Sequence, residues 1–183
     1  MAPPPRTGLY GSDEQDAVEV DLARWLRLSS AVLDDEGVPP DAEVSLIFVD
    51  EEAITDLNRR FLDGTGPTDV LAFPIDHEPA PGGRRPDAGG RGPGSPTEID
   101  EPPMVLGDVV LCPAVASRQG PEHGQTADDE VALLVVHGLL HLLGHDHADT
   151  DDATAMRRRE QELLARHHVA GVGTRGQGAG SEA

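Results

Sequence analysis

The chain has 183 residues, with 34 acidic and 14 basic side chains that give it a formal net charge of −20. A protein that coats nucleic acid needs a wide basic surface that neutralises phosphates, and this charge excludes that class. It leaves room for a small local site that binds an anion, and the 37% of apolar residues suffices for the core of one domain.

The single cysteine, Cys112, excludes an intrachain disulfide and favours a reducing compartment. The amino-terminal segment lacks the apolar stretch of a secretory signal. The most apolar run, Val131 to Gly144, is shorter than the ~20 residues that cross a membrane. We therefore expect a cytoplasmic protein that makes no use of a membrane.

Glycine and proline are distributed unevenly along the chain. They account for 13 of the 26 residues in 78–103, a composition that predicts a long loop without regular elements, inside the domain. The glycine-rich segment 170–183 is predicted to be a disordered tail. The expected organisation is one domain over residues 1–169, interrupted by the loop at 78–103.

Apolar spacing predicts the elements in chain order. A short strand is expected near Leu9, a helix over 21–35, a strand over 43–49, and a helix that begins after Asp50 and includes Leu62. Two further strands are expected at 68–73 and 105–111, the second interrupted by Gly107 and Asp108.

Two helices complete the prediction. Thr126 and the acidic residues after it favour the start of an apolar helix that ends at Gly144, and a last helix is expected over 150–168. A helix that is apolar all round is buried. The fold class expected is α+β, with a small mixed four-stranded sheet packed against helices and one buried central helix.

Four histidines fall within eleven residues of that region, in the segment HGLLHLLGHDH (137–147). His137 and His141 are four residues apart, so on a helix they lie about 40° apart and about 6 Å along the axis. Two imidazoles in this arrangement can converge on one ion. Gly144 is suited to end the helix, after which the chain can return a third histidine to the same ion.

The spacing leaves the third ligand open between His145 and His147. Asp146 is a candidate to accept a hydrogen bond from a ligand or to hold a metal-bound water, or else a solvated turn residue. Three neutral histidines around zinc leave a fourth position for water, which is typical of catalytic sites. Chance placement of histidines in a hydrogen-bonded core is the alternative.

The spacing HxxxHxxGxxH also occurs in metzincin metalloproteases, which carry a glutamate directly after the first histidine as the general base. Here that position is Gly138, which can accept no proton. A protease is therefore the least favoured of the functions that the spacing suggests.

Three segments carry a more specific resemblance. HGLLHLLGHDH is similar to HGxLHLxGYDH of the YbeY family of bacterial metallo-endoribonucleases, LNRRFLDGTGPTDVLAFP (57–74) resembles its LNxxYRxxxxPTDVLSFP, and LGDVVLCP (106–113) resembles its LGDIVIS strand. The resemblance implies a single-strand-specific endoribonuclease that matures ribosomal RNA, especially the 3′ end of the small-subunit RNA, and takes part in ribosome quality control. It also implies one Zn²⁺ held by His137, His141 and His147, and ribosomal particles as partners. Because the net charge of −20 favours weak intrinsic affinity for RNA, we also expect a protein partner.

Two positions depart from the family pattern. His145 replaces its tyrosine, and Leu62 replaces an arginine thought to help bind or cleave RNA. Arg59 and Arg60 lie nearby on the same predicted helix and are candidate substrate-binding residues, with solvated surface arginines as the alternative. No catalytic residue beyond the metal ligands is assigned. The loss of the arginine leaves a second function open, a metal-stabilised ribosome-assembly factor with little catalytic activity.

Overall fold

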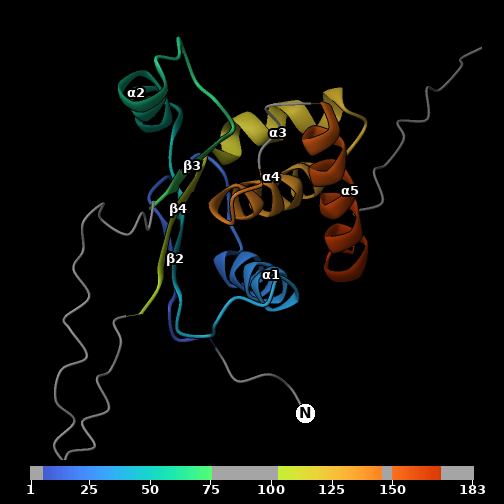
Figure 1. The fold of residues 1–183 in the computed structure, drawn as a ribbon. Coiled ribbons are helices and arrows are strands. Elements are labelled where there is room, and N and C mark those ends of the chain that lie inside the picture. The colour runs from blue at the N-terminus through green and yellow to red at the C-terminus, as the bar shows by residue number, and fades with distance from the viewer. Residues whose placement is uncertain (1–5, 76–102, 146–149, 170–183) are drawn as a thin grey trace, which may run out of the picture.

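Four strands form one sheet in the order β1-β2-β4-β3 (Figure 1). The computed structural model describes residues 6–75, 103–145 and 150–169. β1 (Leu9–Asp13) and β4 (Val105–Leu111) both run parallel to β2 (Glu43–Phe48), whereas β3 (Val70–Pro74) is antiparallel to β4. The mixed four-stranded sheet predicted from the sequence is confirmed.

Strand β4 is continuous through the two residues that were expected to interrupt it. Glu43 pairs with Val105 and Val44 with Gly107, so Leu106 is an extra residue that forms a β-bulge. Gly107 has a φ of 129°, and a Cβ there would lie 2.1 Å from the carbonyl oxygen of Phe73 on β3. The glycine therefore permits the bulge and the close pairing of β3 instead of ending the strand.

Five helices accompany the sheet: α1 (Leu22–Asp35), α2 (Glu51–Leu62), α3 (Pro113–Glu122), α4 (Ala127–Leu142) and α5 (Thr150–His167). Four of them match the predicted helices to within a few residues. The sequence reading missed α3, which contains Gly120 and Pro121 and therefore resembles a loop. Its signal is Pro113 in the first turn, a position where proline favours a helix.

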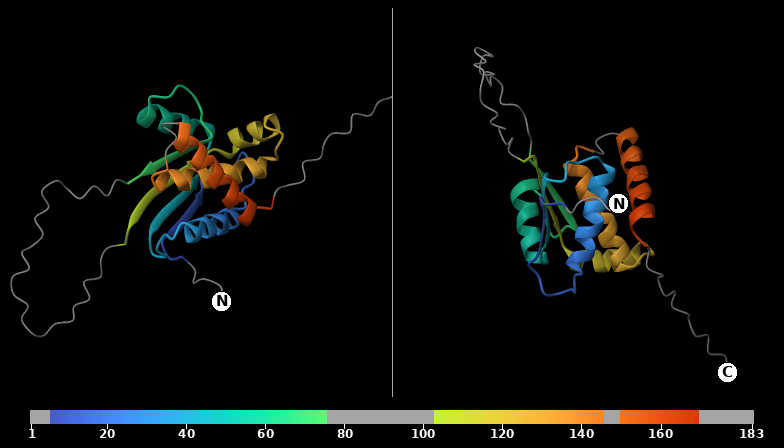
Figure 2. Two further views of the ribbon diagram at one scale, coloured as in Figure 1. Left: turned by 45° about the vertical axis from the view of Figure 1, so that its right-hand side comes forward. Right: turned by 90° about the horizontal axis from the view of Figure 1, so that it is seen from below.

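The helices lie on two sides of the sheet (Figure 2). α1, α4 and α5 enclose the larger apolar cluster, which includes Leu46, Val109 and Leu139. α2 covers the opposite face, where Ile54 packs near Leu71 and Val110 in a smaller cluster. The alternation of side chains along the strands produces this division, because Val109 and Val110 point to opposite faces.

Helix α4 is the most buried helix, and both of its ends are capped. Thr126 and Asp129 form a reciprocal capping box, and ten of the sixteen residues are buried. At the other end Gly144 has a φ of 86°, its N–H donates to the carbonyl of His141, and the N–H of His145 donates to that of Leu140. These bonds form a Schellman motif, so the predicted role of Gly144 as the left-handed cap is confirmed.

Charged pairs tie α5 to the rest of the domain. Arg159 donates to Glu36 at 2.6 Å, and both Arg166 and His167 donate to Asp35 at the end of α1. The hydrogen bond from His167 lowers the pKa of Asp35 more than burial raises it, and Arg166 lowers it further. The carboxyl is therefore ionised wherever the domain is folded near neutral pH.

The predictions for part of the chain lie outside the described residues. They concern the loop at 78–103 (apart from Pro103) and the tail at 170–183, so the organisation into one domain over 1–169 stays a prediction. None of the helices in the described ranges is both long and apolar enough to cross a membrane.

Candidate metal centre

His137 and His141 meet on one face of α4, in the last two turns of the helix. Their Nε2 atoms are 3.1 Å apart, and the rings stand nearly perpendicular, at 78° with centroids 4.5 Å apart. The i, i+4 spacing of a helix places them as predicted. His137 keeps 29% of its side chain exposed, so solvent reaches the pair.

The geometry of this pair fits a shared metal ion. Two nitrogens at the Zn–N distance of about 2.0–2.1 Å and a tetrahedral angle are about 3.3 Å apart, close to the 3.1 Å observed between the Nε2 atoms. Both side chains offer imidazole nitrogens, which are among the donors that zinc prefers. The described residues contain no group of three or more metal-ligating side chains, so the pair is an incomplete site within them.

A third side chain supports the pair from α5. Glu160 Oε1 lies 2.7 Å from Nδ1 of His137, and the Glu160 side chain is only 9% exposed. A carboxylate offers acceptor oxygens, so this contact suits a hydrogen bond that Nδ1 of His137 donates. A carboxylate that is hydrogen-bonded to one ring nitrogen of a histidine, while the other ring nitrogen binds the ion, is the usual outer support of a zinc ligand.

The sequence reading missed Glu160, although a signal for it was present. Met156, Glu160 and Leu163 lie at i, i+4 and i+7, and all three are buried on α5. A carboxylate at a core position of such a stripe needs a buried partner. That pattern indicates a polar contact but does not say with which element.

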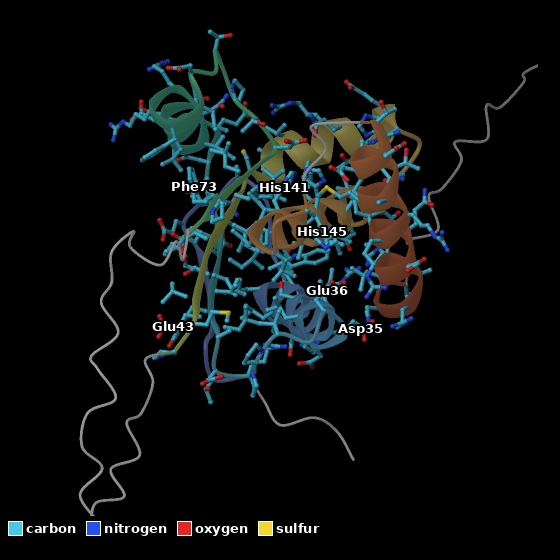
Figure 3. The ribbon with its side chains drawn as sticks, viewed as in Figure 1. Asp35, Glu36, Glu43, Phe73, His141 and His145 are labelled. Carbon is cyan, nitrogen blue, oxygen red and sulfur yellow. The ribbon has the colours of Figure 1, made fainter. Side chains whose placement is uncertain are left out.

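His145 pairs with a carboxylate of α1. It follows the Schellman motif that ends α4, and its Nε2 lies 3.9 Å from Oε2 of Glu36 on α1. Figure 3 shows His145 on the side of the molecule that also carries Glu36 and Asp35. Of the two candidates for the third ligand, the described one is therefore directed to α1.

Asp146 and His147, the other two predicted site residues of this segment, lie outside the described residues. The Schellman motif reverses the chain immediately before them, because Gly144 takes the left-handed conformation. Their roles as partner of a ligand and as third ligand stay predictions.

The predicted substrate-binding arginines are not brought beside the histidines. Arg59 and Arg60 lie on α2, across the sheet from α4, and both are paired with Asp56, at 3.6 and 2.7 Å. Leu62 lies at the end of the same helix and is 61% exposed. Exposed pairs of this kind are weak, so the guanidinium groups can exchange Asp56 for another anion.

Gly138 is buried where α4 packs on the sheet. A Cβ at this position would lie 2.5 Å from Cγ1 of Val109 and 3.4 Å from Cγ2 of Val70. A glutamate here would point into the core and not toward a metal ion between His137 and His141. The position that supplies the base in metzincins therefore has no room for one.

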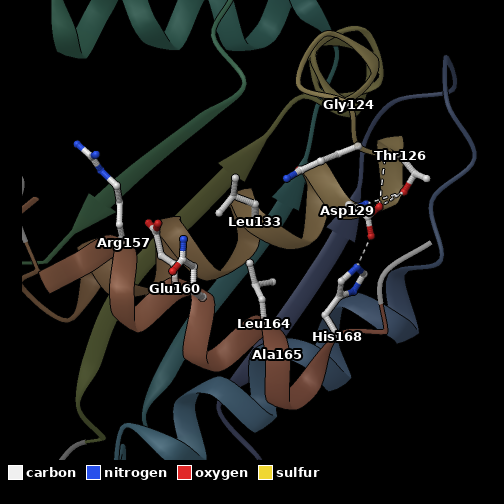
Figure 4. Close-up of a pocket in the computed structure, with 11 residues that line it drawn as sticks. Gly124, Thr126, Asp129, Leu133, Arg157, Glu160, Leu164, Ala165 and His168 are labelled. Atoms are coloured by element: carbon white, nitrogen blue, oxygen red, sulfur yellow. Dashed lines mark hydrogen bonds and ion pairs between the residues drawn. The ribbon is translucent and has the colours of Figure 1, made fainter. Parts of the chain in front are cut away.

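A cavity of about 630 Å³ opens between α4 and α5 next to this site (Figure 4). Arg157 and Glu160 line one wall, and the pair of His168 Nε2 and Asp129 Oδ1, 2.8 Å apart, lines another. Neither His137 nor His141 lines the cavity. Glu160 thus separates the cavity from the histidine pair.

Comparison with known proteins places these features in a family. A family model described as Endoribonuclease YbeY matches residues 11–168. An endoribonuclease YbeY from Thermobifida fusca is 43% identical over 151 residues, which cover 82% of this chain and 88% of the relative. Relatives of the same description from Acidothermus cellulolyticus and Beutenbergia cavernae are each 46% identical, and the matches cover 82% of this chain and 85% and 91% of theirs.

A solved structure agrees with the fold. The solution structure of TM1509 from Thermotoga maritima has a TM-score of 0.50 and 23% sequence identity, and the match covers 86% of this chain and 89% of that chain. This likeness concerns the α+β architecture alone.

Proposed function

Because the chain belongs to the YbeY family of endoribonucleases, we propose that it hydrolyses single-stranded RNA with the help of one bound Zn²⁺. Its substrate would be ribosomal RNA, at the 3′ end of the small-subunit RNA, and its cellular role would be maturation and quality control of ribosomes. The place of this activity would be the cytoplasm, on ribosomal particles and with a protein partner.

The observation that carries the proposal is the pair of Nε2 atoms of His137 and His141, 3.1 Å apart, with Nδ1 of His137 bonded to Glu160. With His147 as the third ligand, these residues would hold the ion and leave one position open. Zinc bound there would supply Lewis acidity toward a phosphoryl oxygen or a water molecule.

The remaining groups have roles of binding and orientation. Arg59 and Arg60 would bind phosphates of the RNA, since Asp56 is an exposed and replaceable partner for both. Strand β3 packs beside α4, with Val70 near Gly138, so an extended RNA can follow this edge of the sheet. Asp146 would hold a water molecule or a ligand N–H.

One specific observation favours a second function. Leu62 supplies no charge where the family has an arginine, and Arg59 and Arg60 lie across the sheet from the histidines. The second candidate is therefore a metal-stabilised ribosome-assembly factor that binds without efficient cleavage. A metalloprotease is disfavoured, because Gly138 neither acts as a base nor leaves room for one.

A cleavage assay separates these functions. Zinc-loaded wild type, His137→Ala and the control His123→Ala are each incubated with single-stranded RNA, double-stranded RNA and casein. His123 is a suitable control because it pairs with Glu130 outside the candidate centre. We expect the wild type and the control to cut single-stranded RNA alone, and His137→Ala to lose more than about 100-fold, since even outer partners of a metal cost 10- to 100-fold.

The remaining outcomes decide against the proposal. Cleavage that persists in fully chelated protein contradicts zinc dependence, and cleavage of casein indicates a protease. Cosedimentation with ribosomal particles without any cleavage supports the assembly factor instead.

A further inference from the structure

The hydrogen bond between α5 and the histidine pair suggests a role for a residue to which no function has been assigned. We propose that Glu160 is a positioning residue, which holds His137 in the tautomer and orientation that present Nε2 to the metal ion. This inference rests on the proposed metal centre and adds to it the group that prepares one of its ligands.

Two contacts of His137 indicate one tautomer. Nδ1 donates to Glu160 at 2.7 Å, so in the neutral ring Nε2 carries a lone pair. Nε2 also lies 3.1 Å from Nε2 of His141, a contact that needs one lone pair between the two nitrogens. In water, a neutral histidine can carry its proton on either ring nitrogen. In a protein, the hydrogen bond made by one nitrogen determines whether the other is available to bind a metal.

The structure holds Glu160 firmly in place. It lies on the buried face of α5 between Met156 and Leu163, one turn from each, and its side chain is 9% exposed. The neighbouring residue Arg159 anchors the same turn to α1 through Glu36. A carboxylate fixed in this way determines the orientation of the imidazole ring, in addition to its electrostatic interaction with that ring.

The chain contains a matched pair for comparison. Glu130 is 3% exposed and its Oε2 lies 3.2 Å from Nδ1 of His123. This is again a buried carboxylate that meets a histidine Nδ1, but His123 is not a candidate ligand. Glu130→Gln therefore controls for the loss of a buried charge from the same domain.

The test measures zinc affinity and the tautomer separately. Zinc affinity of the full chain is measured by competition with a chromophoric chelator, for the wild type, Glu160→Ala, Glu160→Gln and Glu130→Gln. The tautomer of His137 is measured in metal-free protein by long-range ¹H–¹⁵N spectra, at a pH above the range in which histidine titrates. Circular dichroism checks that each variant is folded.

We expect Glu160→Ala to lower zinc affinity by about 10- to 100-fold and to move His137 from the Nδ1–H toward the Nε2–H form. Glu160→Gln, whose amide oxygen still accepts from Nδ1–H, should keep the tautomer and lose less affinity. Glu130→Gln should change neither reading.

Two results overturn the inference alone: wild-type zinc affinity in a folded Glu160→Ala protein, or an Nε2–H tautomer of His137 in the wild type. Absence of zinc binding by the wild type itself overturns the proposed metal centre and, with it, this role of Glu160. Where Glu160→Ala fails to fold, the tautomer of His137 in the wild-type protein still decides, because the Nε2–H form would contradict the inference.

Discussion

Single residues determine how closely α4 approaches the sheet and what its histidines can do. Gly138 lets the helix pack against Val109, while its neighbour His137 points to Glu160 on the other side. The two positions are adjacent in sequence but face opposite surroundings, because successive residues of a helix are about 100° apart. Glycine is thus needed for packing at a position where related-looking motifs carry a catalytic glutamate.

The substitution Gly138→Ala distinguishes packing from helix propensity. Propensity alone predicts a gain of about 1 kcal/mol in an exposed helix. The new Cβ would lie 2.5 Å from Cγ1 of Val109, a stiff β-branched side chain, so we expect a loss of about 1–3 kcal/mol in the free energy of unfolding, measured with denaturant.

The same substitution in a Val109→Ala background serves as the control. Removal of the valine methyl groups makes room, so the cost of Gly138→Ala should be smaller there than in the wild type. Equal costs in the two backgrounds would mean that the contact with Val109 is not the cause.

At the scale of elements, α5 depends on partners that are distant in the chain. It meets α4 through Glu160 and α1 through Arg159, Arg166 and His167. The two helices α4 and α5 flank residues 146–149, which include the predicted third ligand. Docking of α5 therefore depends on polar contacts with both α4 and α1.

The contacts of Asp35 predict that its contribution to the free energy of unfolding depends on pH. Its pKa is lowered in the folded protein, chiefly by the hydrogen bond from His167 and then by Arg166, so its contribution is complete above the ordinary value of 3.8 and is lost as the pH falls through the folded value. We expect Asp35→Asn to lower the free energy of unfolding by about 1 kcal/mol or less at neutral pH.

Denaturant unfolding of wild type and variant at neutral pH and below pH 3.8 measures this effect. The difference between them should shrink in acid. Asp41→Asn, which changes an exposed carboxyl, is the control and should show a smaller difference at neutral pH. A difference for Asp35→Asn that is independent of pH would contradict the assignment.

At the scale of the whole molecule, the acidic residues are concentrated in the part of the sequence that does not carry the histidine segment. Residues 1–60 contain fourteen acidic and five basic side chains, whereas residues 137–183 contain seven and five. We therefore expect weak long-range attraction of RNA, so that the proposed binding would depend on local contacts and on a ribosomal partner. The charge excludes a nucleic-acid coat but is compatible with a nuclease that contacts few phosphates.

The salt dependence of RNA binding tests this view. Each phosphate neutralised on a single strand contributes about −0.7 to the slope of log affinity against log salt. If Arg59 and Arg60 each contact one phosphate, replacing both by alanine should make the slope shallower by about 1.4, measured by fluorescence anisotropy with labelled single-stranded RNA.

The matched control replaces Arg157 and Arg158, two exposed arginines of α5, and should leave the slope unchanged. A change in the control alone would place the RNA on α5 instead of α2, and would contradict the proposed role of Arg59 and Arg60.

The sequence by itself determined the elements whose signals are local. The spacing of His137 and His141, the capping residues of α4 and the left-handed glycine at position 144 depend on neighbours within one or two helical turns. Such patterns can be read directly, because a helix repeats every 3.6 residues and its ends leave fixed groups unpaired. The family resemblance followed from the histidine segment together with the segments 57–74 and 106–113.

Only the tertiary structure decided what those elements meet. It showed that Glu160, 23 residues after His137, is the partner of its Nδ1, that His145 is directed to Glu36, and that α2 lies across the sheet from α4. These contacts join helices whose order in space is set by the burial of a shared core, and not by any local period. A carboxylate at a core position of a helix predicts from the sequence that a buried polar partner exists. Only the packing of the helices determines which residue that partner is.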